Sequence, residues 1–568
     1  MVSQIDFSDV RALQRASPMN TGKYRPYRPV GLADRNWPDR QPTRAPLWCS
    51  VDLRDGNQAL MEPMAPERKL RMFRLLVGLG FKEIEVGYPT ASADDYEFIR
   101  MLVAEDEIPE DVVIQVMAPI RGDFIERTVK ALQGVPQACV QIFNPTSTTQ
   151  RRVVFGMDQA QTLGMAVRGA EELLRLRDSL PGTRIHLQYA PESFTQTEPD
   201  FALDVCNAVL ERWLPATGDQ LRINLPATVE VFPPHEFADR IEYVSRGLAG
   251  REQGGGRVLL SVHPHNDRGS GVAAAELAVL AGADRVEGCL FGQGERTGNV
   301  CLVTLAMNLF SQGVDPMLDL RDLDGVRQAA EECTRMPVGP RHPWVGDFVY
   351  TSFAGGHQDA ISKGLRARAE SEDPYWDVPY LPIDPMDVGR DYRALIRINS
   401  QSGKGGIAYL LRSAYGLELP RRFQIELASV LQREAEESGG EVGAERLWEI
   451  FRGEFTAAEF TAAEDAAVEP AEFGGIRFGT DPEETARRAL ELLAVPATVR
   501  EVSVQAVEGR GHVGYCEVVV GRRGFWGAGI ADEPGRAVAE AARAAAGRVP
   551  RGLLAQAGHG RQLDLVGA

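Results

Sequence analysis

Two short segments about 200 residues apart contain residue types that could bind a metal ion and act on a carbonyl compound. Arg54 and Asp55 follow one apolar run, and His263 and His265 end another. Residues i and i+2 of a strand project to the same side, so the two imidazoles can share one target. A carboxylate and two imidazoles suit Zn²⁺, Mn²⁺ or Mg²⁺, and Asn299 could supply a further oxygen. The guanidinium of Arg54 could stabilise negative charge that develops on a reacting oxygen.

Three further polar residues occur where buried strands are expected to run or to end. Glu85 lies within an apolar run, where it is the natural partner to hold Arg54 in place. Glu192 follows the fifth expected strand and could orient a substrate or relay a proton, although a carboxylate in a loop is more often simply solvated. Thr228 follows the sixth expected strand. Because these residues come from distant parts of the chain, their common position at strand ends predicts one site.

The elements that would position these residues alternate between short apolar runs and helical patterns, from residue 47 to about residue 312. The expected strands are Leu47–Leu53, Glu83–Val86, Val112–Met117, Cys139–Phe143, Ile185–Tyr189, Leu221–Leu225, Val258–His263 and Arg285–Gly288. The clearest helices are Pro66–Leu79, Asp158–Leu180 and Ser270–Ala281. Eight such units in about 265 residues predict a TIM barrel, which places its chemistry at the C-terminal ends of the strands. An open doubly wound sheet competes, but Arg54-Asp55-Gly56-Asn57 does not fit its Gly-rich phosphate turn.

Composition excludes several classes of protein. The chain of 568 residues has 62 Lys and Arg against 80 Asp and Glu, a net charge of −18, and no basic stripe that would indicate a nucleic-acid surface. No run reaches the roughly 18 apolar residues of a membrane span, and the N-terminus does not have the layout of a signal peptide. The seven cysteines are scattered without a C-x-x-C pair, which indicates reduced thiols and a cytoplasmic protein.

The chain is too long for one domain, and its composition changes along its length. We expect an N-terminal arm at 1–46, the barrel at 47–320, mostly helical auxiliary subdomains and a linker at 321–470, and a small α/β domain at 471–568. In that last domain, Gly-containing segments at 478–482 and 527–532 each precede a helical pattern. They could form a pseudo-symmetric ligand site, or they could be ordinary strand-to-helix turns.

Taken together, these segments resemble the 2-isopropylmalate synthases, which are metal-dependent Claisen-condensing TIM barrels. The matching segments are 52–60, 84–89, 224–230, 263–269 and 294–299 in the barrel, with 355–360 and 398–406 in the auxiliary subdomains. Segments 24–26 and 37–40 are similar to the long actinobacterial-type form. The resemblance implies condensation of acetyl-CoA with 3-methyl-2-oxobutanoate, followed by thioester hydrolysis to 2-isopropylmalate and CoA, the first committed step of leucine biosynthesis.

The resemblance also implies a role for each residue. Asp55, His263 and His265 would bind the metal, with Asn299 nearby. Arg54, held by Glu85, would polarise the keto oxygen, while Thr228 and Glu192 would contact the keto acid and the acetyl donor. His357 and Tyr392 would reach the barrel of the partner chain in a homodimer and serve in proton transfer. The C-terminal domain would be a regulatory module that binds leucine around Gly527, Gly529, Ile530 and Ala531.

Two positions depart from the pattern of the family. Gln141 stands where close relatives have a histidine, which changes the polarity of the pocket. The segment 478–482 lacks the Gly-Asn-Gly-Pro pattern expected of the first regulatory turn, which bears on leucine sensitivity. A homocitrate or citramalate synthase differs from this reading only in its keto acid, and a lyase or carboxylase could use the same barrel. A non-catalytic metal- or leucine-binding sensor is a further alternative, although it would not need Arg54 and Glu85.

Overall fold

The computed structural model describes residues 19–217, 220–251, 256–352, 354–390, 407, 411–412, 414–438, 444–456, 478–550 and 552–554. The chain divides into two compact units. One consists of Met1–Leu320 with Gly325–Val338, and the other of Arg321–Asp324 with Gly339–Ala568. Among the described helices, none is long and apolar enough to cross a membrane. All seven cysteines are buried, and no disulfide joins any two of them in the part of the chain that the structure describes.

Within the described residues of the first unit, eight parallel strands close into a barrel in the order in which they occur along the chain. The strands are β1 Leu47–Ser50, β2 Glu83–Gly87, β3 Val113–Pro119, β4 Gln137–Pro145, β5 Arg184–Glu192, β6 Leu221–Ala227, β7 Val258–Pro264 and β8 Arg285–Gly288. Pairing of β1 with β8 closes the ring. The predicted TIM barrel is confirmed, with each strand within a few residues of its predicted position.

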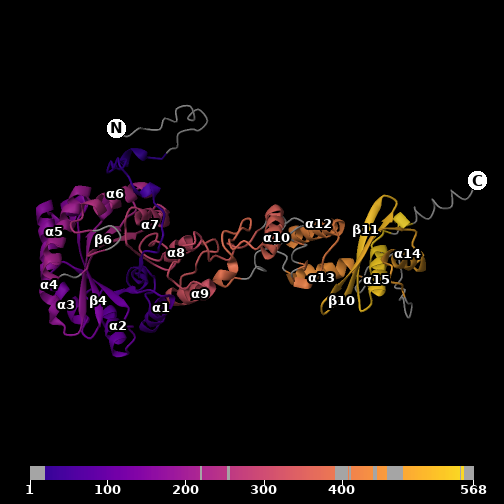
Figure 1. Cartoon of the computed structure of the whole chain (residues 1–568), viewed down its shortest axis with the longest axis horizontal. Helices are drawn as coiled ribbons and strands as arrows, with labels where there is room; N and C mark the ends of the chain where they lie inside the picture. Colours follow the sequence, from indigo (N-terminus) through magenta and orange to yellow (C-terminus); the bar gives the residue numbers. More distant parts are fainter. Residues whose placement is uncertain are drawn as a thin grey trace, which may run out of the picture. The chain divides into compact units, whose positions relative to one another are not determined.

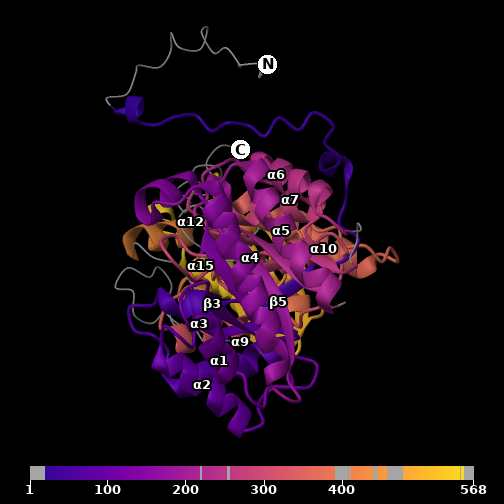
Figure 2. The same cartoon turned by 90° about the vertical axis from the view of Figure 1, so that its left-hand side faces the viewer.

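Helices cover the outside of the barrel (Figure 1). They are α1 Pro66–Leu79, α2 Ala93–Ala104, α3 Phe124–Ala131, α4 Gln159–Leu176, α5 Pro199–Thr217, α6 Pro234–Gly247, α7 Gly271–Leu280 and α8 Leu302–Phe310, followed by α9 Leu323–Thr334. Figure 2 views the barrel from the side covered by α3, α4 and α5. Local sequence sets several ends: α4 begins at a reciprocal cap between Asp158 and Gln161, and α1 ends at Gly80, whose φ of 102° favours glycine.

Two strand ends, those of β1 and β5, differ from the prediction by three residues, and both differences affect the site. β1 stops at Ser50, and Asp52–Gly56 forms a π-helical turn instead of continuing the strand. This turn carries Arg54 and Asp55 beyond the end of β1, and such irregular turns are frequent at functional sites. β5 runs three residues further than predicted, so Glu192 is its last residue instead of a loop residue.

Residues 30–37 of the N-terminal arm lie along α6, which offers them three buried carboxylates. Arg35 forms two-pronged contacts with Asp239, with Nη2 to Oδ2 at 2.7 Å, and Trp37 Nε1 donates to the same carboxylate at 2.8 Å. Backbone N–H groups of Val30 and Asn36 donate to Glu236 and Glu242, respectively. These contacts satisfy acidic groups that would otherwise be costly to bury.

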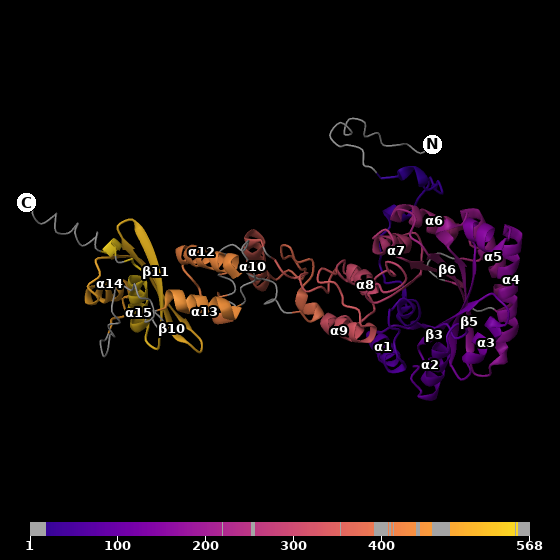
Figure 3. The same ribbon diagram turned by 180° about the vertical axis from the view of Figure 1, so that it is seen from behind.

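The second unit contains α10 Gly355–Glu370, α12 Arg421–Ser438, α13 Ala444–Phe455, α14 Pro482–Leu492 and α15 Pro534–Gly547. Its sheet has antiparallel strands β9 Thr498–Val507, β10 Gly511–Val520 and β11 Arg523–Ala531, with β10 in the middle. Alternate residues of β10 face opposite sides. Cys516 and Val518 pack with α14 and α15, whereas Tyr515 packs with Phe423 of α12. Figure 3 shows α12 and α13 on one side of the sheet and α14 and α15 on the other.

The predicted second glycine turn, at 527–532, is wrong in its secondary structure. Residues 527–531 lie inside β11, where Gly527 pairs with Cys516 and Gly529 pairs with Gly514. A Cβ atom at Gly527 or Gly529 would overlap backbone atoms of α15. The glycines therefore allow the Ala-rich helix α15 to pack directly on the strand.

Candidate metal centre and active site

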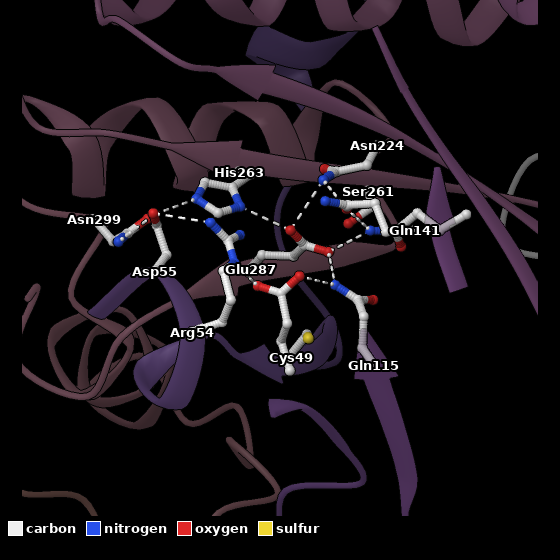
Figure 4. Close-up of polar contacts among 12 residues, drawn as sticks. Cys49, Arg54, Asp55, Gln115, Gln141, Asn224, Ser261, His263, Glu287 and Asn299 are labelled. Atoms are coloured by element: carbon white, nitrogen blue, oxygen red, sulfur yellow. Dashed lines mark hydrogen bonds and ion pairs between the residues drawn. The ribbon is translucent and has the colours of Figure 1, made fainter. Parts of the chain in front are cut away.

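The structure brings the three predicted metal ligands together at the C-terminal end of the barrel. Asp55 Oδ2 lies 3.2 Å from His263 Nε2 and 3.1 Å from His265 Nε2. One ligand atom from each residue lies within 4.8 Å of the other two, and all three side chains are buried. Figure 4 shows Asp55 and His263 pointing toward each other from the turn after β1 and from β7. The i, i+2 spacing therefore brings both imidazoles to the carboxylate.

The second nitrogen of each histidine has its own partner. His263 Nδ1 lies 2.7 Å from Glu287 Oε2, and His265 Nδ1 donates to the Thr228 carbonyl oxygen at 2.8 Å. These partners place the lone pair of each neutral ring on Nε2, facing Asp55, which is how metal-binding histidines are usually oriented. The donor set and its orientation fit a divalent metal.

Electrostatics favour ionised groups at the ligands. Burial raises the pKa of Asp55, but the charge of Arg54 and the hydrogen bonds to the histidines outweigh it and hold the pKa well below its usual range. Burial lowers the pKa of His263, but hydrogen bonds to Asp55 and Glu287 outweigh it and raise the pKa to about 10. Because a ligating imidazole must be neutral, a metal ion that bound here would displace a proton.

Asn299 lies beside the carboxylate and has one unused oxygen. Its Nδ2 donates to Asp55 Oδ2 at 2.9 Å and to the Gln293 carbonyl at 2.8 Å. Its Oδ1 is buried and has no hydrogen-bond partner in the described part of the chain. Gly294, with a φ of 146°, makes room for this amide, because a Cβ there would overlap Asn299 Nδ2.

Arg54 is held on two sides inside the barrel mouth. Its Nε donates to Glu85 Oε2 at 2.6 Å, and its Nη1 donates to Asp55 Oδ1 at 2.9 Å. Glu85 is fully buried in β2, and Gln115 of β3 also donates to it, at 3.1 Å. The guanidinium is therefore held in a fixed orientation beside the candidate metal ligands.

Sequence reasoning missed the buried carboxylate of Glu287, which lies beside His263 on the side away from Asp55 (Figure 4). Besides His263, it accepts hydrogen bonds from Arg285 Nη1 at 2.5 Å, Gln188 Nε2 at 2.6 Å and Asn224 Nδ2 at 2.9 Å. The signal was present in the run Arg285-Val286-Glu287, which places two charged residues on the same side of an apolar strand. Charges inside a barrel strand need partners, so they indicate an internal polar network.

A pocket of about 320 Å³ opens beside the ligands. Residues that line it include Tyr88, Met117, Gln141, Phe143, Ala190 and Asn224. Glu192 and Thr228 also line it, and burial raises the pKa of Glu192 above its usual value. Thr228 Oγ1 accepts a hydrogen bond from the backbone N–H of Ser193 at 2.9 Å, which leaves its hydroxyl hydrogen free to donate. Glu192 and Thr228 therefore both lie at the pocket beside the candidate metal ligands.

Other predicted residues lie elsewhere. His357 belongs to α10 in the second unit, where its ring stacks on Tyr380 at a centroid distance of 3.9 Å. Tyr392 and the segment 398–406 lie outside the described residues. Ile530 is partly exposed on β11, next to Ala531 at the end of that strand.

A parallel barrel with an Asp-His-His cluster at its mouth defines a TIM barrel with a candidate metal site, and comparison with known proteins narrows the class of protein. The HMGL-like family matches residues 45–329, and the alpha-isopropylmalate synthase post-catalytic domain family matches residues 347–412. A 2-isopropylmalate synthase of Parafrankia sp. is 51% identical over 91% of this chain and 95% of its own length. Another, of Kocuria rhizophila, is 47% identical over 95% of this chain and 99% of its own length. The chain belongs to the 2-isopropylmalate synthase family and is an acyltransferase.

Proposed function

We propose that this chain condenses acetyl-CoA with 3-methyl-2-oxobutanoate and hydrolyses the thioester to give 2-isopropylmalate and CoA. The observation that carries this proposal is the convergence of Asp55, His263 and His265 beside Arg54, in a chain about half identical to 2-isopropylmalate synthases. The same function makes leucine biosynthesis the pathway that the chain serves.

Asp55, His263 and His265 would hold a divalent metal, and Asn299 offers its unpaired Oδ1 as a further oxygen. When bound, the metal supplies Lewis acidity and an anchor for the carbonyl and carboxylate oxygens of the keto acid. Two nitrogens with oxygen donors suit Zn²⁺, Mn²⁺ or Mg²⁺. The buried site excludes bulk water, which strengthens each of these contacts.

Arg54 would stabilise the negative charge that gathers on the former keto oxygen during carbon–carbon bond formation. Its planar guanidinium is already fixed by Glu85 and Asp55, so it loses little freedom during the reaction. The Thr228 hydroxyl can donate to the carboxylate of the keto acid. Glu192 lines the pocket with a raised pKa, which suits a residue that holds and passes on a proton near the acetyl group.

A release assay for CoA tests this function against the alternatives within the same fold. Purified chain with acetyl-CoA and metal should release CoA fastest with 3-methyl-2-oxobutanoate among a panel that includes 2-oxoglutarate and pyruvate. Faster release with 2-oxoglutarate would indicate a homocitrate synthase, and faster release with pyruvate a citramalate synthase. No release with any 2-oxo acid would contradict the proposed reaction and leave a metal- or leucine-binding sensor.

We also infer a homodimer in which His357 and Tyr392 of one chain serve the barrel of the other. The inference rests on the resemblance of segment 355–360 to the auxiliary subdomain of the family. Mixing an Asp55→Ala chain with a His357→Ala chain should restore part of the activity, because one barrel in each mixed dimer would be complete. Subunit exchange without any restored activity would refute action between chains.

Leucine is the effector that we propose for the second unit, near Gly527, Gly529, Ile530 and Ala531. The proposal rests on the resemblance to the family. Because segment 478–482 lacks the Gly-Asn-Gly-Pro pattern, leucine binding must be measured directly. Calorimetric titration of the full chain with leucine should show saturable binding. Absence of binding at millimolar leucine would mean that this unit serves assembly alone.

A further inference from the structure

Gln141 is a polar side chain in an otherwise mostly apolar part of the pocket. β3, β4 and β5 contribute Met117, Phe143 and Ala190 to the same wall. In the closed barrel these strands lie across from β1, β7 and β8, which lead to the metal ligands. A 2-oxo acid held by its keto and carboxylate oxygens beside Asp55 would therefore direct its side chain toward Gln141.

Charged groups determine which atom of the Gln141 amide, oxygen or nitrogen, faces Gln188. Arg285 has only donors, and its Nη1 donates to Gln188 Oε1 at 3.1 Å. Because Oε1 of Gln188 faces Arg285, the amide nitrogen Nε2 points the other way. This nitrogen donates to Glu287 Oε1 at 2.6 Å. The same nitrogen also donates to Gln141 Oε1. The fixed charges of Arg285 and Glu287 thus set the orientation of Gln188, and Gln188 sets that of Gln141.

Asn224 fixes the same orientation from a second side. Its Nδ2 donates to Glu287 Oε2 at 2.9 Å and to Gln141 Oε1 at 3.1 Å. Arg285, which has only donors, donates to Glu287 Oε1 at 2.5 Å and so marks this carboxylate as an acceptor. Two donors therefore occupy Gln141 Oε1, and exchange of its oxygen and nitrogen would break both hydrogen bonds.

The amide nitrogen of Gln141 takes no part in this hydrogen-bond network. Within the described residues, Gln141 Nε2 has no hydrogen-bond partner, and it is not among the fully enclosed unsatisfied atoms, whereas the residue lines the pocket. The pocket wall therefore presents an N–H donor whose orientation is set by buried charges. A donor facing an alkyl group has no partner, and leaving a donor unsatisfied costs about 1–3 kcal/mol.

We propose that Gln141 is a specificity-determining residue whose amide nitrogen donates a hydrogen bond to the side chain of the 2-oxo acid. Between branched 2-oxo acids of the same shape, the pocket would favour the one with an acceptor, such as a hydroxyl group, on the carbon next to the keto group. This inference rests on the proposed condensation, and it adds a preference within that reaction.

A matched pair of substrates tests it. In 3-hydroxy-3-methyl-2-oxobutanoate a hydroxyl replaces one methyl group of 3,3-dimethyl-2-oxobutanoate, so the two acids have nearly the same shape. The wild type should show a kcat/KM about tenfold or more higher for the hydroxylated acid, the scale of one hydrogen bond in a pocket. Gln141→Met keeps the length of the side chain without its donor and should bring this ratio close to one. Met117→Leu, on the neighbouring strand, should keep the wild-type ratio.

Each outcome bears on the proposal. A wild-type ratio near one, or an unchanged ratio in Gln141→Met, would overturn it. If Gln141→Met does not fold, Gln141→Leu, which also lacks the donor, takes its place and should bring the ratio close to one. Release of CoA with 3-methyl-2-oxobutanoate, measured in parallel, separates the two levels: turnover without discrimination refutes the role of Gln141 alone. No turnover with any 2-oxo acid refutes the condensation, and the preference with it.

Discussion

Short sequence motifs indicated both the barrel mouth and the C-terminal sheet. The two motifs differ in the groups that their residues contact in the folded protein. At the barrel mouth, His263 and Arg54 both contact the carboxylate of Asp55. In the C-terminal sheet, Gly527 and Gly529 meet the backbone of a helix.

This difference shows that charged residues and glycines do not indicate a functional site equally strongly. A buried charge is costly without a partner, so charged residues at the ends of apolar strands indicate a site where partners converge. Glycine indicates only that something approaches the backbone closely, and that can be a ligand or a packed helix. The polar motif therefore predicted contacts that the structure contains, whereas the glycine motif left two meanings open.

The largest expected effect is loss of the metal ligands. Asp55→Ala, His263→Ala and His265→Ala should each lower CoA release by about 10³-fold or more, because several kcal/mol of charge stabilisation disappear with the metal. Thermal melting of the variants controls for folding. Near-normal turnover in any one of them would remove that residue from the site.

Replacement of Arg54 should have the next largest effect. Arg54→Lys keeps the charge but cannot donate to both Glu85 and Asp55 with a planar group, so kcat should fall by about 10²–10³-fold. Steady-state kinetics distinguish the possible roles. A raised KM with unchanged kcat would show that Arg54 only binds substrate.

A smaller effect should follow at Glu287, and a second buried glutamate provides a matched control. Glu287→Gln weakens the acceptor of His263 Nδ1 and should reduce metal affinity by about 10–100-fold. Glu83 is also buried and pairs with Arg285 at 2.6 Å, but it contacts no metal ligand. Glu83→Gln should therefore lower stability without changing metal affinity. Equal losses of affinity in both variants would show that the effect comes from stability alone.

The smallest effect concerns the glycines of the second unit. Gly527→Ala should lower the free energy of unfolding by about 1–3 kcal/mol, because the new methyl group meets backbone atoms of α15 that cannot move aside. Gly479→Ala is the control, since nothing lies within 4 Å of a Cβ at that position. Denaturant unfolding measures both. If Gly527→Ala instead keeps its stability but loses leucine binding, the glycine serves a ligand site.

The sequence predicted most of the barrel because each strand combines an apolar run with a following helical pattern, which are strong local signals. It predicted Asp55, His263 and His265 because strand periodicity places two imidazoles on one side. The turn at Asp52–Gly56 was not predictable, because a π-helical turn has no distinct sequence pattern. Glu287 was missed because its strand was read for its apolar residues, although its role depends on partners from four other strands.

The metal site at Asp55, His263 and His265 is tested most directly by the metal content of the purified wild type and of Asp55→Ala, measured together with CoA release. We expect one divalent ion per wild-type chain, loss of activity with a chelator, and recovery of activity when metal returns. For Asp55→Ala we expect little bound metal and no recovery of activity. Full metal occupancy in Asp55→Ala, or chelator-resistant CoA release by a metal-free wild type, would contradict the assignment of this site.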